Sequence, residues 1–253
     1  MGRRKFKEIP EEDLRELENF LEKSNQQESV LVSTLNVNVK CKTENQKKLI
    51  NSIKQNEITI CSGLPGTGKT FLSCAQALKL LKSKNPAKYK RIVLIKSVTT
   101  LKNEEIGFLK GSLEEKMEPY IDSFMDNFRK LIGKSRTNSL RGFGLIEVLP
   151  IAFARGRSID NSIIIIDEAQ NISMDNIRTL MTRIGNDSKM IILGDVKQKD
   201  IKNKNDSALE VVIDKFKDIN NFGCVELRDP NDVVRNPIIR IIESIFERLD
   251  NGE

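Results

Sequence analysis

Four consecutive isoleucines, Ile163–Ile166, constrain the fold of this chain more than any other feature of its sequence. They end at two carboxylates, Asp167 and Glu168, so both faces of this predicted strand are apolar up to its last residue. Strands with one wet face alternate apolar and polar residues, whereas parallel strands covered by helices on both faces do not. The run therefore predicts a parallel sheet between two layers of helices.

Other short apolar runs repeat this pattern along the chain, with helical or loop segments between them. They predict strands over residues 58–62, 92–95, 146–149, 190–193 and 224–227. Helices are predicted over residues 69–82 and 174–184, and over residues 231–249 with an interruption at Pro237. The predicted fold class is α/β, a mostly parallel sheet with helices on both faces.

The first 42 residues are predicted to be an extension of a core that spans residues 43–253. Apolar residues at helical spacing predict one helix within residues 1–28, and the valines from Val30 to Val39 predict a short strand or hairpin. Thr43 is a suitable N-cap for the first core helix, which is predicted to run through Ile53.

The composition excludes several classes of protein. The chain of 253 residues has no His, which removes Ser-His-Asp and Cys-His catalysis and every His-containing zinc site. Its four Cys form no C-x-x-C pair, so we expect reduced thiols rather than a zinc knuckle or a disulfide framework. The N-terminal segment lacks the apolar region of a signal peptide, and no apolar stretch is long enough for a membrane span. We expect a soluble, cytoplasmic protein.

The net charge of +6 is unevenly distributed. Residues 79–102 contain eight Lys or Arg and no acidic residue, residues 129–141 form a second acid-free stretch, and residues 197–204 hold a third cluster. Such clusters attract the phosphates of a nucleic acid, although solvated lysines on helix faces would give the same composition. The Gly and Ser content of the second stretch is typical of a mobile loop.

The segment from Gly63 to Thr70 reads G-x-x-x-x-G-K-T and lies between a predicted strand and a predicted helix, the context that a phosphate-binding loop requires. Its backbone N–H groups would surround the phosphates, Lys69 would reach the β- and γ-phosphates, and the Thr70 hydroxyl would bind Mg²⁺. Gln46 would read the adenine edge with both ends of its amide. The expected ATP-binding residues are Gln46, Gly63, Leu64, Pro65, Gly66, Thr67, Gly68, Lys69, Thr70 and Phe71.

Two further strand ends carry polar residues. Asp167 is expected to join Thr70 in holding Mg²⁺, and Glu168 to orient and polarise the attacking water of an ATP hydrolase. An acidic pair after a strand could instead cap a helix. Gln198, after the predicted strand 190–193, is expected to sense the γ-phosphate, although Gly194–Gln198 would also suit a plain turn.

From Thr43 to about Ile245 the chain resembles the PhoH family of P-loop ATPases, whose core is similar to the first RecA-like lobe of superfamily 1 helicases. The resemblance implies ATP binding and hydrolysis, association with RNA, and ring-like self-assembly. Lys96-Ser97 departs from the Arg-Pro that the family often has there. Matching strings include Thr43/Gln46, Gly63–Thr70, Asp167–Asn171, Thr182–Gly185, Gly194–Gln198 and Val233–Pro237.

The expected function is therefore that of an ATPase directed to single-stranded RNA or another nucleic acid, with helicase-like or remodelling character. The alternative is an ATP-switched accessory protein of a nuclease or RNA-processing complex without unwinding activity, and a small-metabolite kinase is disfavoured. A single lobe lacks the arginine that a second lobe would supply, so the arginine must come from this chain or from a neighbouring one, and a ring such as a hexamer of identical chains is expected. The candidate arginines are Arg155, Arg157, Arg183 and Arg235, of which Arg235 and the Arg155/Arg157 pair are favoured.

Overall fold

The structure is a computed structural model that describes residues 11–83, 88–96, 113–198 and 208–250. It divides into two units, residues 1–35 and residues 36–253. The first unit contains α1 (Glu11–Ser33), which confirms the predicted N-terminal helix and lengthens it.

The strand or hairpin predicted around residues 30–39 is wrong. The helix α1 continues through Val30, and the N–H of Thr34 donates to the carbonyl of Val30 at 3.1 Å. Residues 34–43 contain no strand. Valine favours strands mainly where it packs against neighbouring strands, and this segment has none, so continuation of the helical hydrogen bonds decides its conformation.

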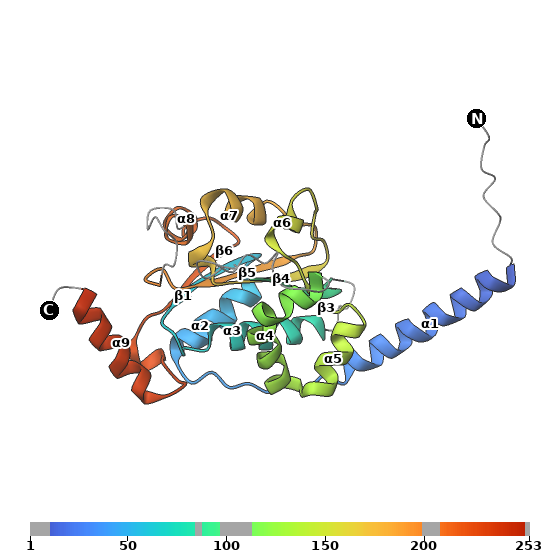
Figure 1. Ribbon diagram of the computed structural model, residues 1–253, viewed down its shortest axis with the longest axis horizontal. Coiled ribbons are helices and arrows are strands. Elements are labelled where there is room, and N and C mark those ends of the chain that lie inside the picture. The colour runs from blue at the N-terminus through green and yellow to red at the C-terminus, as the bar shows by residue number, and fades with distance from the viewer. Residues whose placement is uncertain (1–10, 84–87, 97–112, 199–207, 251–253) are drawn as a thin grey trace. The chain divides into compact units, whose positions relative to one another are not determined.

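The second unit is built on a parallel sheet with the strand order β3-β2-β4-β5-β1-β6 (Figure 1). Every neighbouring pair is parallel, which confirms the predicted fold class. The strands are β1 (Ile58–Gly63), β2 (Arg91–Lys96), β3 (Ile146–Val148), β4 (Ser162–Asp167), β5 (Lys189–Gly194) and β6 (Phe222–Leu227).

Helices cover both faces of this sheet. Figure 1 shows α2 to α5 on one face and α6 to α8 on the other. None of the helices in the described part of the chain is both long and apolar enough to cross a membrane. The helices are α2 (Glu44–Gln55), α3 (Lys69–Leu81), α4 (Leu113–Ile132), α5 (Lys134–Gly142), α6 (Ile151–Ala154), α7 (Met174–Met181), α8 (Ala208–Phe216) and α9 (Pro237–Asp250), with single turns η2 (Ala169–Asn171) and η4 (Pro230–Asp232).

Alternate residues of each strand enter different cores. Ile164 and Ile166 belong to a cluster that also contains Ile177 of α7 and Leu209 of α8. Ile163 and Ile165 alternate with them and face the opposite layer, where Phe124 and Phe128 of α4 are fully buried. This double burial is the reason why the isoleucine run had no polar alternation.

Two other expectations fail. Residues 129–141 do not form a loop: α4 ends at Ile132, Gly133 turns the chain with a φ of 84°, and α5 follows. Burial of Leu140 gives α5 a core contact that the local composition did not indicate. The last helix is not interrupted at Pro237 but begins there, because proline suits the first turn, where no N–H is needed.

The register brings the ends of the strands to one edge. Lys96 is the partner of Asp167 across β2 and β4, and Ser62 is the partner of Gly194 across β1 and β5. The carboxyl ends of parallel strands form the edge at which ligands bind in α/β sheets. The polar strand ends noted in the sequence therefore meet in one place.

Candidate functional site

The glycine-rich loop joins β1 to α3. Gly66 and Gly68 have φ angles of 76° and 83°, a left-handed conformation that residues with a Cβ rarely adopt. Gly63 is required for space, because a Cβ there would lie 2.6 Å from the carbonyl oxygen of Leu227 at the end of β6. The loop and the N-terminus of α3 together are built to receive an anion.

Gln46 lies behind this loop. Its Nε2 donates to the carbonyl of Thr67 at 2.9 Å, and its Oε1 accepts from the N–H of Lys42 at 2.6 Å. The side chain is buried, with 3% of its surface exposed. The structure thus gives Gln46 a bracing contact with the loop, and an adenine contact through both ends of its amide stays a prediction.

The Lys69 ammonium group rests on the loop itself. Its Nζ donates to the carbonyl oxygens of Gly63 at 2.5 Å and of Leu64 at 3.0 Å. Burial lowers the pKa of Lys69, while the negative charges of Asp195 and Asp167 act to raise it. Phosphate oxygens would replace the two carbonyls as partners of the ammonium group and would supply negative charge to a half-buried cation.

Thr70 and Asp167 meet as the sequence predicted. The Thr70 Oγ1 donates to Asp167 Oδ2 at 3.1 Å. Burial, and then the charge of Glu168, raise the pKa of Asp167 to about 6, and the nearby Lys96 acts to lower it. A buried carboxylate beside a hydroxyl fits Mg²⁺. In the described residues no group of three or more His, Cys, Asp or Glu side chains gathers, so phosphate oxygens and water would complete the coordination of the ion.

Glu168 occupies an unusual backbone position. Its φ is 56°, in the left-handed region, and its N–H donates to Asp167 Oδ1 at 3.1 Å. The carboxylate lines the same cleft as Lys69 and accepts from Gln170 Nε2 at 2.7 Å through Oε2. A carboxylate next to the metal-binding residues Thr70 and Asp167 can accept a proton from water, which is what a hydrolase requires.

The cleft has a volume of about 540 Å³. Gln198 lines it at a turn after β5, with its N–H donating to the Asp195 carbonyl at 3.1 Å. Of the predicted nucleotide-binding residues, Pro65, Gly66, Gly68, Lys69, Thr70 and Phe71 line the cleft, while Gln46, Gly63, Leu64 and Thr67 are buried.

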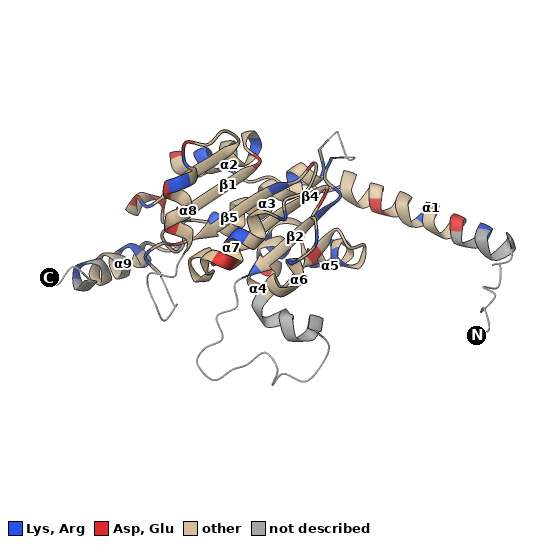
Figure 2. Cartoon of the chain, turned by 90° about the horizontal axis from the view of Figure 1, so that it is seen from above, with Lys and Arg blue, Asp and Glu red and all other residues tan. Residues whose placement is uncertain are grey.

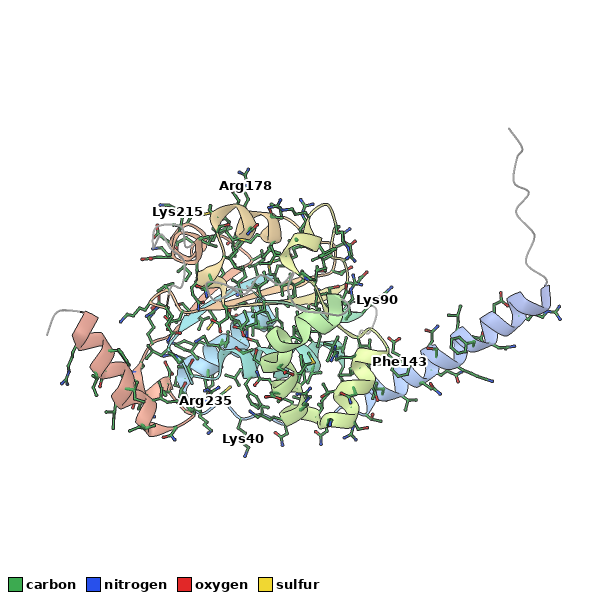
Figure 3. All side chains as sticks on the ribbon, in the orientation of Figure 1. Lys40, Lys90, Phe143, Arg178, Lys215 and Arg235 are labelled. Atoms are coloured by element: carbon green, nitrogen blue, oxygen red, sulfur yellow. The ribbon has the colours of Figure 1, made fainter. Side chains whose placement is uncertain are left out.

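The candidate arginines lie in different places. Arg235 lines the cleft and lies beside the start of α9 (Figure 3). Arg155 donates to Asn176 Oδ1 at 3.3 Å, and Arg157 pairs with Glu147 at 3.9 Å. Neither Arg155 nor Arg157 is among the described residues that line the cleft. Only Arg235 of these three can approach a nucleotide bound in its own chain.

The basic clusters are only partly within the described residues. Lys79, Lys82, Lys88 and Lys90 of the first cluster are exposed, and the rest of residues 79–102 include the undescribed 84–87 and 97–102. Lys134 and Arg136 of the second are exposed on α5, and most of 197–204 lies outside the described residues. Figure 2 shows Lys and Arg on several elements of the chain.

Sequence reasoning missed one wall of the cleft and one arginine. Lys96 and the α4 residues Ser123 and Lys130 also line the cleft. Arg228, directly after β6, donates to Asp195 Oδ1 at 3.2 Å and to Ser62 Oγ at 3.1 Å. Lys96 and Arg228 lie at the carboxyl ends of strands, and this position could have indicated that they belong to the site. No local sequence feature indicated that the α4 residues line the cleft.

Comparison with known proteins gives one family match and several relatives. A family model described as "PhoH-like protein" matches residues 38–247. A PhoH-like protein of Bacillus subtilis is 36% identical over 90% of this chain and 70% of its own length, and one of Synechocystis is 35% identical over 84% of this chain and 63% of its own. Among solved structures, the large terminase of a thermophilic bacteriophage matches over 79% of this chain and 49% of its own, with 8% identity and a TM-score of 0.47.

The family match extends over the residues that form the cleft. The matched range begins before Gln46 and ends after Arg235, and so includes the loop, the carboxylate pair and the turn at Gln198. This range is most of the chain, and the two relatives are identical to this chain at 36% and 35% of the aligned residues. The chain belongs to the PhoH-like protein family.

Proposed function

We propose that this chain is a Mg²⁺-dependent ATPase that acts with single-stranded RNA or another nucleic acid. The observation that carries the proposal is the meeting of Lys69, the Thr70–Asp167 pair and Glu168 in one cleft. A site for phosphate binding alone needs the loop and its lysine. The further presence of two residues that can bind Mg²⁺, Thr70 and Asp167, and of a second carboxylate favours hydrolysis.

Each group has a distinct part in this proposal. The loop N–H groups and Lys69 bind and orient the phosphates, and Glu168 accepts the proton of the attacking water. Thr70 and Asp167 would hold Mg²⁺, which neutralises charge on the phosphates when it is bound. Gln198 lines the cleft, where it would sense the γ-phosphate, and Arg235 is a cation available in the same chain.

The proposal is tested by the ATPase rate of the full chain alone, with single-stranded RNA and with single-stranded DNA. Turnover that depends on Mg²⁺ and rises with RNA supports an RNA-directed ATPase. Measurable ATP binding with little turnover in all three conditions favours the alternative, an ATP-switched accessory protein of a nuclease or RNA-processing complex. Absence of ATP binding would overturn both.

Nucleic-acid binding should depend steeply on salt, because lysines and arginines release counterions when they contact phosphates. We expect Lys134→Gln combined with Arg136→Gln to lower the slope of log affinity against log salt by about 1.4 for a single strand, at about 0.7 for each lost contact. Lys215→Gln with Lys217→Gln makes the same charge change on and just after α8, where both lysines pair with Asp214, and should leave the slope unchanged. The measurement is RNA binding across a salt series. Equal slopes for the parent and both variants would mean that Lys134 and Arg136 do not contact the phosphates of the RNA.

Self-assembly is supported by the helix α9. Its residues Ile238, Ile241, Ile242, Ile245 and Phe246 are each 43–60% exposed, and their spacing places them on one side of the helix. The helix begins two residues after Arg235, which lines the cleft together with Val234. A second copy that covered this face would therefore adjoin the nucleotide, and we propose that such contacts close a ring.

An arginine supplied by a neighbouring chain can be detected by mixing inactive variants. A Lys69→Ala chain mixed with an Arg155→Ala/Arg157→Ala chain should recover part of the turnover, because some interfaces then hold an intact lysine and an intact arginine pair. A Lys69→Ala chain mixed with an Arg235→Ala chain should not recover turnover. Arg235 lines the cleft of its own chain, so every site in that mixture lacks either the lysine or the arginine. The measurement is the ATPase rate of each mixture against its separate components.

The controls use α9. Ile242→Glu introduced into both chains places a charge on the exposed apolar side of α9 and should abolish recovery, whereas Ser244→Glu adds the same charge on the other side and should preserve it. Recovery with Arg235→Ala would place that arginine in the neighbouring site. A monomer with full turnover would contradict the assembly proposal.

A further inference from the structure

Gln170 connects the candidate base to the neighbouring strand. It lies in the turn η2, two residues after Glu168, and 2% of its surface is exposed. Its Nε2 donates to Glu168 Oε2 at 2.7 Å, and its Oε1 accepts from the backbone N–H of Asp195 at 3.0 Å. Because that N–H can only donate, the amide oxygen must face Asp195 and the NH₂ group must face Glu168. The orientation of the amide is thus determined by its partners.

The packing around this amide leaves it little freedom. A Cβ on Gly194 would lie 2.7 Å from Gln170 Oε1 and 2.6 Å from a methyl group of Leu209. Only glycine at this position allows the Gln170 side chain to reach the end of β5. Gly194 therefore serves the Gln170 contact as well as the turn that follows.

Asp195 is itself held from the other side. It is 4% exposed, and its Oδ1 accepts from the N–H of Lys197 at 3.1 Å and from Arg228 Nη2 at 3.2 Å. The same Nη2 donates to Ser62 Oγ at 3.1 Å, one residue before the phosphate-binding loop. The acceptor side of Gln170 is thus tied to β1, β5 and the end of β6, none of which carries Glu168.

We propose that Gln170 is a positioning residue for ATP hydrolysis: it holds one carboxylate oxygen of Glu168 so that the other faces the cleft. The inference rests on the proposed ATPase function. Glu168 follows a residue at the edge of the sheet and has left-handed backbone geometry, and the bond from Gln170 is the contact that fixes its carboxylate beside the cleft. A misplaced base can slow a reaction by about 10²-fold without loss of substrate binding.

The test compares turnover and ATP binding in variants of Gln170 in the full chain. Gln170→Leu, of similar size, should lower kcat at least ~10-fold, while the Kd for ATP, measured with Mg²⁺, stays within about 3-fold. Gln170→Glu, assayed at pH 8, keeps an acceptor for the Asp195 N–H but replaces the donor to Glu168. It should lose turnover to a similar extent. Because it keeps the polar contact to Asp195, it serves as a second variant in case Gln170→Leu fails to fold. Ser173→Asp adds the same charge at the start of α7, where Ser173 makes no side-chain cap bond, and should leave turnover unchanged.

A double-mutant cycle separates positioning from general structure. In a Glu168→Ala chain there is no carboxylate to position, so Gln170→Leu should change the residual rate less than about 2-fold. The inference is overturned if both Gln170 variants keep near-normal kcat, or if Gln170→Leu costs as much in the Glu168→Ala chain as in the parent. Failure of the ATPase proposal would differ, since the parent chain itself would then show no Mg²⁺-dependent turnover.

Discussion

Lys69→Ala should abolish ATP turnover and weaken ATP binding about 10²-fold or more. The ammonium group is the cation at the centre of the phosphate-binding loop, and its present partners are two neutral carbonyls, those of Gly63 and Leu64. Charged hydrogen bonds to phosphate are about twice as strong as neutral ones, so alanine removes the strongest expected contact with the nucleotide. The measurement is ATP binding by calorimetry together with the steady-state ATPase rate.

Thermal unfolding provides a second measurement of the same change. A ligand that binds the folded chain at about 100 times its Kd stabilises it by about 2.7 kcal/mol, and the Lys69→Ala chain should lose most of this gain. Lys79→Ala is the matched control, because Lys79 is exposed on the same helix and does not line the cleft. Near-normal turnover in a folded Lys69→Ala protein would reject the phosphate-site assignment.

The sheet could be predicted because its signal is local. A parallel strand that is covered on both faces must be apolar throughout, and a run such as Ile163–Ile166 has few other solutions. The phosphate-binding loop was predictable for a similar reason. Glycine is required at fixed spacing, because Gly66 and Gly68 have left-handed φ angles and there is no space for a Cβ at Gly63. The backbone geometry of the loop can therefore be recognised from the sequence.

The errors arose where conformation depends on something outside the segment. The valines near residue 30 favour a strand only if other strands are present, and here the helix α1 simply continues. The segment 129–141 is polar and contains glycine and serine, yet burial of Leu140 and Thr137 against the core makes most of it helical. Local composition cannot report a distant packing partner.

The network around Glu168 shows the same limit at the site. Gln170 is 25 residues from Asp195, and Asp195 is 33 residues from Arg228. Their contacts exist because β4, β5 and β6 end at one edge of the sheet. The sequence indicated that the ends of β4 and β5 were polar, but which strand end contacts which follows only from the strand order β4-β5-β1-β6.

The division of labour between Asp167 and Glu168 gives the second large effect. Glu168→Gln should bind ATP with Mg²⁺ normally but hydrolyse it at least ~10²-fold more slowly, the usual contribution of a positioned base. Glutamine has the same shape and can still accept from Gln170 through its amide oxygen, so the left-handed turn at φ 56° is no more strained than before. The loss would then report the base and not the fold.

Asp167→Asn should fail earlier, at the step of metal binding. Asp167 is buried beside Thr70, and asparagine keeps an oxygen for the Thr70 hydroxyl but removes the charge that Mg²⁺ requires. ATP affinity should therefore lose its dependence on Mg²⁺, which a titration of Mg²⁺ against ATP affinity measures, while Asp175→Asn on the exposed first turn of α7 should behave as the parent. The two substitutions are isosteric and adjacent, so a defect in folding would lower ATP binding and turnover in both variants. The proposed roles instead predict a defect in Mg²⁺-dependent binding for Asp167→Asn and a defect in the rate of hydrolysis for Glu168→Gln. If Asp167→Asn abolishes Mg²⁺-dependent binding while Glu168→Gln hydrolyses ATP at the parental rate, Glu168 is not the base, and the water must be oriented by another residue that lines the cleft, of which Gln198 is the nearest in chemistry.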